Sequence, residues 1–196
     1  MTNEEFRRHA HAFVFNPHKW LFTNFDCSAH FVRDPDALVR TLEVLPEFLK
    51  TREWSRVIDY RDWSVPLGRR FRALKLWFVI RSYGVAEIRR MIAAHIDLAR
   101  ELEEWIRRAD DFELLAPRRL ALLNFRYRPA GVTDPAELDR LNERLLERLN
   151  DSGELYLTQN RVRGAYAIRF SIGQTATRRR HVEAAWKKIQ DTARSR

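Results

Sequence analysis

Residues 16–34 read NPHKWLFTNFDCSAHFVRD, and within them Lys19 stands between His18 and Trp20, just after the short apolar run Ala12–Phe15. A lysine at the end of a strand is a candidate for chemistry, because a primary amine attacks aldehydes once burial or a neighbouring cation lowers its pKa. On spacing alone the simpler interpretation is favoured, in which Lys19 is a surface lysine between two strands.

The surrounding sequence changes that balance. The run Asn16–Asp34 closely resembles the pyridoxal-lysine segment of the group II pyridoxal-phosphate decarboxylases, the aromatic-L-amino-acid decarboxylase family. Residues 59–85, DYRDWSVPLGRRFRALKLWFVIRSYGV, resemble the next block of that family in the same order. The resemblance implies an α/β enzyme of fold-type I, pyridoxal 5'-phosphate as cofactor, and decarboxylation of an aromatic L-amino acid.

The resemblance also implies a division of the chain. Residues 1–109 correspond to the C-terminal part of the cofactor-binding large domain, with the pyridoxal lysine and a mobile loop. Residues 110–196 correspond to the small C-terminal α/β domain. Members of the family are considerably longer, so this chain is expected to be a C-terminal fragment that is weak or inactive alone. A homodimer, or pairing with an intact homologue, is expected by the same resemblance.

Three residues of the first block are expected at the cofactor. By the resemblance, Lys19 holds pyridoxal phosphate through its amine, and Asn16 and His18 lie near the cofactor phosphate. Each of the latter two has a structural alternative: the Asn16 side chain satisfies backbone groups of the turn, and His18 orients the loop.

Two further residues are expected on the substrate side. Gly68, in PLGRR, matches a glycine that shapes the substrate pocket in related decarboxylases, although a backbone role before a helix explains it equally well. Arg169, in YAIRFSI, occupies the place of a family arginine near the active site. Its alternative is a strand arginine paired with a surface carboxylate.

Phe48 is a departure from the family pattern. LPEFLKT places Phe48 where the family's mobile loop carries a tyrosine that returns a proton to the substrate carbon after carbon dioxide leaves. Phenylalanine has no proton to give. A completed protein with this loop is therefore expected to decarboxylate poorly or to act as an aldehyde-forming oxidative deaminase, as some relatives with such a loop do.

Composition limits the other function classes. The chain has 196 residues, with 36 Lys and Arg against 27 Asp and Glu, a net charge of +9. Most arginines alternate with acidic residues on helix faces, which indicates solvated surfaces, so a nucleic-acid partner is not expected. Cys27 is the single cysteine, which fits a cytoplasmic location. No apolar run is long enough for a membrane span.

A metal site is not expected either. The N-terminal segment carries Glu4, Glu5, His9 and His11, which could mimic a metal cluster, but solvated or remnant sequence is the favoured interpretation. Three functions of different class remain: a portion of a decarboxylase, a non-catalytic remnant that pairs with an intact homologue, and a basic nucleic-acid-binding domain. The third leaves the two resembling blocks unexplained.

Hydrophobic periodicity predicts the elements of both parts. In the first part it predicts two strands around the lysine loop, a helix after Asp34, a long loop over 46–66, a buried helix over 70–83 and a long amphipathic helix over 85–108. His95 on this last helix is expected to be a packed core residue. The second part is predicted as strand, strand, helix, strand, strand, helix, with strands at 112–115, 120–127, 155–158 and 165–172, and a helix that begins at Asp134.

Overall fold

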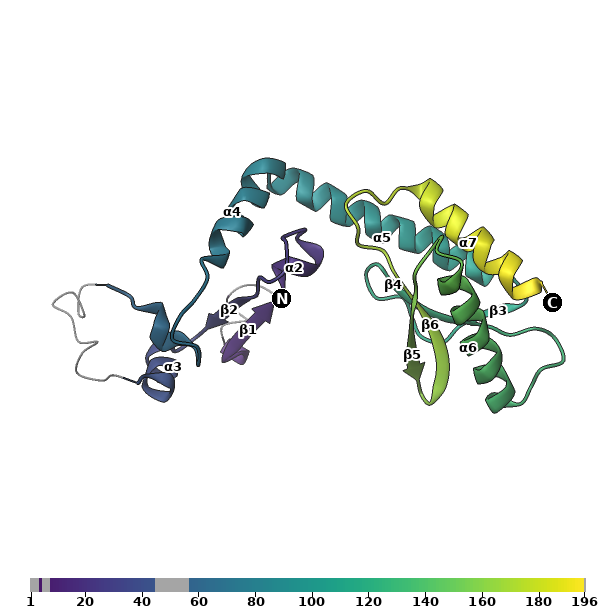
Figure 1. Ribbon diagram of the computed structural model, residues 1–196, viewed down its shortest axis with the longest axis horizontal. Coiled ribbons are helices and arrows are strands. Elements are labelled where there is room, and N and C mark those ends of the chain that lie inside the picture. Colours follow the sequence, from purple (N-terminus) through teal and green to yellow (C-terminus); the bar gives the residue numbers. More distant parts are fainter. Residues whose placement is uncertain (1–3, 5–7, 45–56, 196) are drawn as a thin grey trace. The chain divides into compact units, whose positions relative to one another are not determined.

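The computed structural model describes residues 4, 8–44 and 57–195. Contacts within the chain divide it into two compact units, Met1–Gly84 and Val85–Arg196. Figure 1 shows the elements of both. The long helix after Gly84 thus packs with the second unit, whereas the domain division expected at residue 110 stays a prediction about the family fold.

The first unit is built around the lysine turn. Strands β1 (Ala12–Phe15) and β2 (Ala29–Val32) pair antiparallel, with Phe13 opposite Phe31. Between them the chain forms one helical turn, α2 (Pro17–Trp20), where a loop was predicted, so that prediction is wrong for these four residues. Pro17 explains the turn, because a proline at the first helical position has its φ angle preset for a helix.

Two short helical segments follow β2. Helix α3 (Pro35–Leu42) begins as predicted, since Asp34 Oδ1 accepts a hydrogen bond from Ala37 N at 3.0 Å. The loop predicted over 46–66 lies partly outside the described residues, and its described part contains a 3-10 turn, η2 (Tyr60–Trp63).

Helix α4 (Arg72–Tyr83) confirms the predicted helix but not its predicted burial. None of its residues is buried, and Trp77 is 54% exposed. Its apolar residues surround much of the helix, which requires covering surfaces on several sides, whereas the one sheet in the described part of this unit has only two strands. Gly84 ends the helix at φ +76°, a value that favours glycine.

The second unit is a four-stranded antiparallel sheet with strand order β3-β4-β6-β5. The strands are β3 (Phe112–Leu114), β4 (Leu122–Tyr127), β5 (Thr158–Val162) and β6 (Ala165–Ser171). Three helices pack with it: α5 (Val85–Arg107), α6 (Pro135–Asp151) and α7 (Arg179–Arg194). The order of elements predicted for residues 112–194 is confirmed.

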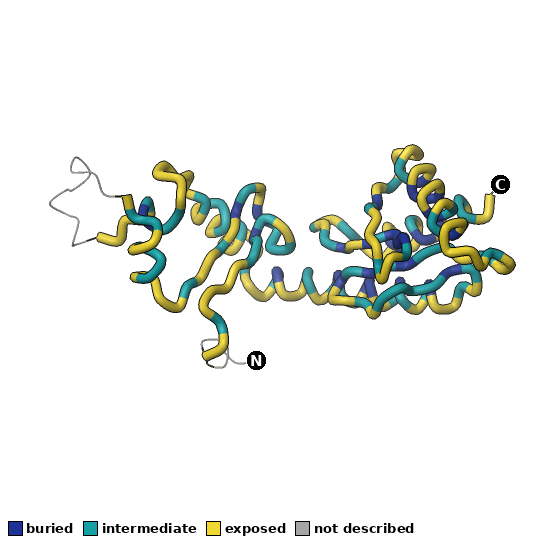
Figure 2. Tube along the Cα trace, turned by 90° about the horizontal axis from the view of Figure 1, so that it is seen from below, coloured by how far each residue is buried: buried dark blue, intermediate teal, exposed yellow. Residues whose placement is uncertain are grey.

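The core of the second unit lies between one face of the sheet and the helices. In β4 the alternate residues Leu123 and Phe125 are buried, and they lie opposite the buried Phe170 and Ile168 of β6. Asn124 and Arg169 lie on the other face and are only partly buried, as is usual when an antiparallel sheet is covered on one side, although the small Ala167 of β6 is fully buried as well. Figure 2 shows the buried residues concentrated in this unit.

Two details of this unit test the sequence-based predictions. His95 is buried and its Nε2 lies 3.1 Å from Gln174 O, so its core placement is confirmed. The bounds predicted for the third strand, 155–158, are wrong, because β5 begins only at Thr158 and ends at Val162. The reason is local: both backbone groups of Leu157 are hydrogen-bonded to the Asn150 side chain, at 2.9 and 3.0 Å, and not to a neighbouring strand.

Candidate functional site

The lysine turn is anchored on both sides of Lys19. Pro17 is buried and its carbonyl accepts from Thr23 N at 3.2 Å, while Lys19 N donates to Asn16 O at 2.9 Å. The Lys19 side chain is exposed. Among the described residues no hydrogen bond or ion pair engages its ammonium group. The backbone of the turn is therefore fixed, and the amine remains accessible to a carbonyl compound.

His18 faces the segment that follows the turn. Its Nδ1 lies 3.0 Å from Cys27 N and 2.7 Å from Cys27 O, so this nitrogen either accepts from the amide or donates to the carbonyl. The ring also contacts Phe25 edge-on, with 5.0 Å between centroids. These contacts support the orienting role considered for His18, and they leave Nε2 as the ring nitrogen available to a ligand.

Asn16 makes a contact that differs from the structural alternative. Its side chain makes no capping hydrogen bond to α2, and Oδ1 instead accepts from Ser28 Oγ at 2.6 Å. The side chain therefore joins the turn to the residue before β2. Because Oδ1 is engaged, the amide NH2 group is the part of Asn16 with hydrogen-bonding capacity for an anion.

The two residues expected on the substrate side lie in different units. Gly68 is exposed, and a Cβ placed on it would meet no atom within 4 Å, so nothing in the described structure requires glycine there. Arg169 projects from β6 on the face opposite the core, beside Asn124 and Thr158 of the neighbouring strands. Its guanidinium lies 3.5 Å from Thr158 Oγ1 and forms no ion pair with a described carboxylate. Both substrate roles stay predictions.

Phe48 lies outside the described residues. Of the predicted site residues, the structure brings together Asn16, His18 and Lys19, which are also close neighbours in the chain. Within the described part of the first unit, it does not bring any other predicted site residue into contact with them.

Sequence reasoning missed the residues that support the turn. Asp26 Oδ2 accepts from Arg72 at 2.8 Å to Nε and 2.7 Å to the terminal nitrogen, and Lys75 Nζ lies 3.8 Å from Oδ1. The hydrogen bond from Arg72 lowers the pKa of Asp26 to about 2. A signal was available: the first turn of α4 carries Arg72 and Lys75 and no acidic residue, a charge pattern that calls for an anion from elsewhere.

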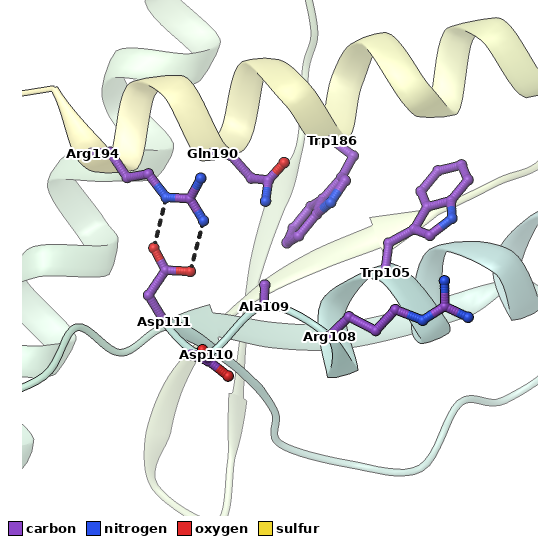
Figure 3. Close-up of a pocket in the computed structure, with 8 residues that line it drawn as sticks. All are labelled: Trp105, Arg108, Ala109, Asp110, Asp111, Trp186, Gln190 and Arg194. Carbon is purple, nitrogen blue, oxygen red and sulfur yellow. Dashed lines mark hydrogen bonds and ion pairs between the residues drawn. The ribbon is translucent and has the colours of Figure 1, made fainter.

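A cavity lies in each unit. In the first unit a cavity of about 330 Å³ lies at the start of α4, lined by Arg70, Phe71, Arg72, Leu74, Lys75 and Phe78. In the second unit a cavity of about 660 Å³ lies between α7 and the end of α5. The latter, in Figure 3, contains none of the predicted site residues.

The polar end of the second cavity is an internal ion pair. Arg194 donates two hydrogen bonds to Asp111, at 2.8 and 2.9 Å, which lower the pKa of Asp111 and raise that of Arg194 (Figure 3). Trp186 and Gln190 of α7 border the same cavity. Because both charges are engaged with each other, this arrangement serves to attach α7 to the segment before β3.

The described part of the chain has neither a metal cluster nor a membrane-spanning helix. Among residues 4, 8–44 and 57–195, no group of three or more His, Cys, Asp or Glu side chains is arranged to hold a metal ion. Within the same residues, no helix combines the length and the apolar character needed to span a bilayer.

Residues 7–128 match the pyridoxal-dependent decarboxylase conserved domain, and the chain belongs to this family. The family expected from residues 16–34 and 59–85 is therefore confirmed, with pyridoxal phosphate as its cofactor. The α/β fold-type I architecture is confirmed as well, because the structure matches solved members of the family.

Individual proteins of this family are similar to the chain over most of its length. The chain is 46% identical over 189 residues to tyrosine decarboxylase 4 of Petroselinum crispum and 42% identical over 194 residues to phenylacetaldehyde synthase of a Rosa hybrid cultivar. These alignments cover 94% and 95% of this chain but 37% and 38% of the relatives. A crystal structure of Oryza sativa TDC with PLP and tryptamine matches with a TM-score of 0.89 and 38% identity, over 95% of this chain and 39% of that one.

Proposed function

We propose that this chain forms the lysine-bearing part of a pyridoxal-phosphate-dependent carboxy-lyase that acts on an aromatic L-amino acid, with Lys19 as the residue that takes the cofactor. The observation that carries the proposal is the exposed amine of Lys19 on an anchored turn, in a chain that belongs to the pyridoxal-dependent decarboxylases. The chain spans only 37% of the length of tyrosine decarboxylase 4.

The residues of the turn fit this cofactor in their chemistry. Lys19 supplies the amine for the aldehyde, and the imidazole Nε2 of His18 and the amide of Asn16 supply polar groups for the phosphate. Bound there, pyridoxal phosphate would supply an electron-withdrawing ring that stabilises the charge left on the substrate carbon when carbon dioxide departs. The turn itself contributes position, because its backbone hydrogen bonds fix the direction from which the amine approaches.

The substrate and the residues that would bind it are part of the same proposal. The relatives named tyrosine decarboxylase and tryptophan decarboxylase support an aromatic L-amino acid. Arg169 is proposed to bind the substrate, since it is a cation with no carboxylate partner among the described residues. Gly68 is proposed to leave space for the substrate, which agrees with the open space around the position that a Cβ would take there.

The direct test maps the cofactor lysine. The chain has five lysines, so incubation with pyridoxal phosphate, borohydride reduction and peptide mass spectrometry can assign the label fully. We expect the label mainly on Lys19 and its loss in Lys19→Arg. Lys187→Arg, which removes an exposed lysine of α7, is the matched control and should keep the Lys19 label. Equal labelling of all the lysines would contradict the proposal.

The reaction type is tested by its products. With L-tyrosine or L-tryptophan we expect the amine, and we expect Phe48→Tyr to raise the ratio of amine to aldehyde, because tyrosine has a proton to give and phenylalanine has none. Aldehyde and hydrogen peroxide as the main wild-type products would instead favour oxidative deamination.

A dimeric partner is part of the same proposal. Support comes from the exposed apolar side chains of α4, including Trp77 and Phe78, because exposed apolar patches of this kind often mark protein interfaces. Sedimentation over a range of concentrations should show self-association. A strictly monomeric chain that also does not bind an intact homologue would count against a dimeric partner.

We further propose a cytoplasmic location, which agrees with a single cysteine.

A further inference from the structure

We propose that Arg72 is a positioning residue for the lysine turn: with Asp26 it clamps the segment Leu21–Ser28 to the start of α4, and this segment orients the turn that carries Lys19. The inference rests on the proposed function insofar as Lys19 takes the cofactor. The clamp itself is a structural claim that can be measured without any cofactor.

The first link is between the segment and the helix. The Asp26 carboxylate accepts hydrogen bonds from the Arg72 guanidinium on Oδ2, and Lys75 Nζ lies 3.8 Å from Oδ1. The carboxylate therefore lies between two cations. Both partners come from the first turn of α4, far along the chain from Asp26. Asp26, Arg72 and Lys75 are about one third exposed, and hydrogen bonds between ionised groups are among the stronger ones in proteins.

Helix α4 has a physical need for this anion. Its first turn carries two cations and no acidic residue, and its N-cap residue Phe71 offers no side-chain hydrogen bond. Cations at a helix N-terminus are unfavourable because that end of the helix carries a partial positive charge. The Asp26 carboxylate compensates the positive charge of the two side chains and of the helix end.

A second attachment of the segment to α4 is the ring contact between Phe22 and Tyr83, at 6.5 Å between centroids.

The second link is between the segment and the lysine turn. Cys27 and Ser28, which follow Asp26 directly, hold the turn: Cys27 N and O lie within 3.2 Å of His18 atoms, and Ser28 Oγ donates to Asn16 at 2.6 Å. Three consecutive residues therefore connect the helix to the turn, the first by its carboxylate and the next two by their contacts with Asn16 and His18.

The buried thiol of Cys27 reports on this connection. It is 4% exposed, and its Sγ lies 3.9 Å from the backbone carbonyl oxygen of Arg72 at the start of α4, so separation of this segment from α4 would expose it. It is the only cysteine in the sequence. The rate at which a disulfide reagent modifies the chain therefore measures the opening of this segment.

The experiment compares Arg72→Gln with Arg90→Gln, which removes the same charge from an exposed pair with Glu87 on α5. We expect Arg72→Gln to raise the rate of Cys27 modification at least about tenfold, as loss of a charge-assisted hydrogen bond can shift a local opening equilibrium. Arg90→Gln should leave the rate unchanged. Asp26→Asn removes the clamp from the other side, and should behave like Arg72→Gln.

Two further measurements separate positioning from general stability. The exchanged pair Asp26→Arg with Arg72→Asp should recover part of the wild-type Cys27 rate. Under the borohydride protocol, Arg72→Gln should spread the pyridoxal label from Lys19 to other lysines, and Arg90→Gln should not. An unchanged Cys27 rate in both single variants of the clamp overturns the proposal, as does a label that stays on Lys19 while Cys27 opens. A wild-type chain with a protected Cys27 but no selectivity for Lys19 would uphold the clamp and contradict the proposed function.

Discussion

At the scale of single residues, the sequence was most informative where the residues of one site are also close neighbours in the chain. Asn16, His18 and Lys19 could be recognised because they are almost adjacent and carry the family pattern. Asp26 and Arg72 could not, since an ion pair between residues 46 positions apart leaves no local trace beyond an unbalanced helix start. Asn142, a fully buried polar residue on the leucine-rich face of α6, could not be recognised from the sequence either, because it bonds to the backbone of Tyr127, 15 positions away.

The Asp26 carboxylate should contribute to stability over a defined pH range. Its pKa is lowered by Arg72 from 3.8 to about 2 in the folded chain. A lowered pKa stabilises the fold above the unfolded value, and this contribution is lost as the pH falls through the folded value. Compared by urea unfolding, Asp26→Asn should destabilise the chain equally at pH 7 and pH 5, and progressively less between pH 4 and pH 2. A difference that grows as the pH falls would contradict this assignment.

Asn142 makes a second prediction at this scale. Its side chain accepts from Tyr127 N at 2.7 Å and donates to Tyr127 O and Leu138 O at 2.8 and 2.9 Å. Asn142→Leu leaves the Tyr127 backbone groups without these partners, so the free energy of unfolding should fall by about 2–4 kcal/mol. The control is Asn160→Ala at an exposed position, where the side chain donates to Asn124 Oδ1 at 3.3 Å and accepts from Arg161 N at 2.8 Å. Water can replace both contacts there, so the free energy of unfolding should change by less than about 0.5 kcal/mol.

At the scale of elements, capping signals were more reliable than apolar runs. Asp34 and Asp134 mark helix starts in both sequence and structure, because the interaction is made within a few residues. The start of β5 could not be read in this way, since the Asn150 side chain takes the backbone groups of Leu157. The predicted burial of α4 was wrong. Its apolar content indicates that its surface should pack against other surfaces, but it does not indicate whether those surfaces belong to the same unit.

The cap of α6 can be tested directly. Asp134 accepts from Ala136 N and Glu137 N, at 3.3 and 3.1 Å, and satisfies two backbone donors at the start of the helix. Asp134→Ala should lower the free energy of unfolding by about 1 kcal/mol. Asp151→Ala removes an acid from the other end of the same helix, where the helix dipole disfavours it, and should not destabilise. Equal losses in both variants would mean that charge, and not capping, accounts for the effect.

At the scale of the whole molecule, the two units differ in how well they bury apolar surface. The second has a sheet with one covered face and fully buried residues such as Leu123 and Ile168. The first has a two-stranded sheet and exposes Phe31, Trp77 and Phe78. A two-stranded sheet is marginal on its own, so the first unit depends more on clamps such as Asp26 with Arg72.

This contrast predicts two separate unfolding transitions. In hydrogen exchange followed by mass spectrometry across a urea series, amides of Ala12–Val32 should lose protection at lower urea than amides of β4 and β6, because fewer buried contacts oppose local opening. Leu149→Ala empties a fully buried position of α6 and should destabilise the second unit by about 2–5 kcal/mol, while the midpoint of the first unit stays where it was. If both units instead lose protection at one midpoint, and Leu149→Ala moves that midpoint for both, the chain unfolds as a single cooperative body and the difference in burial does not govern its stability.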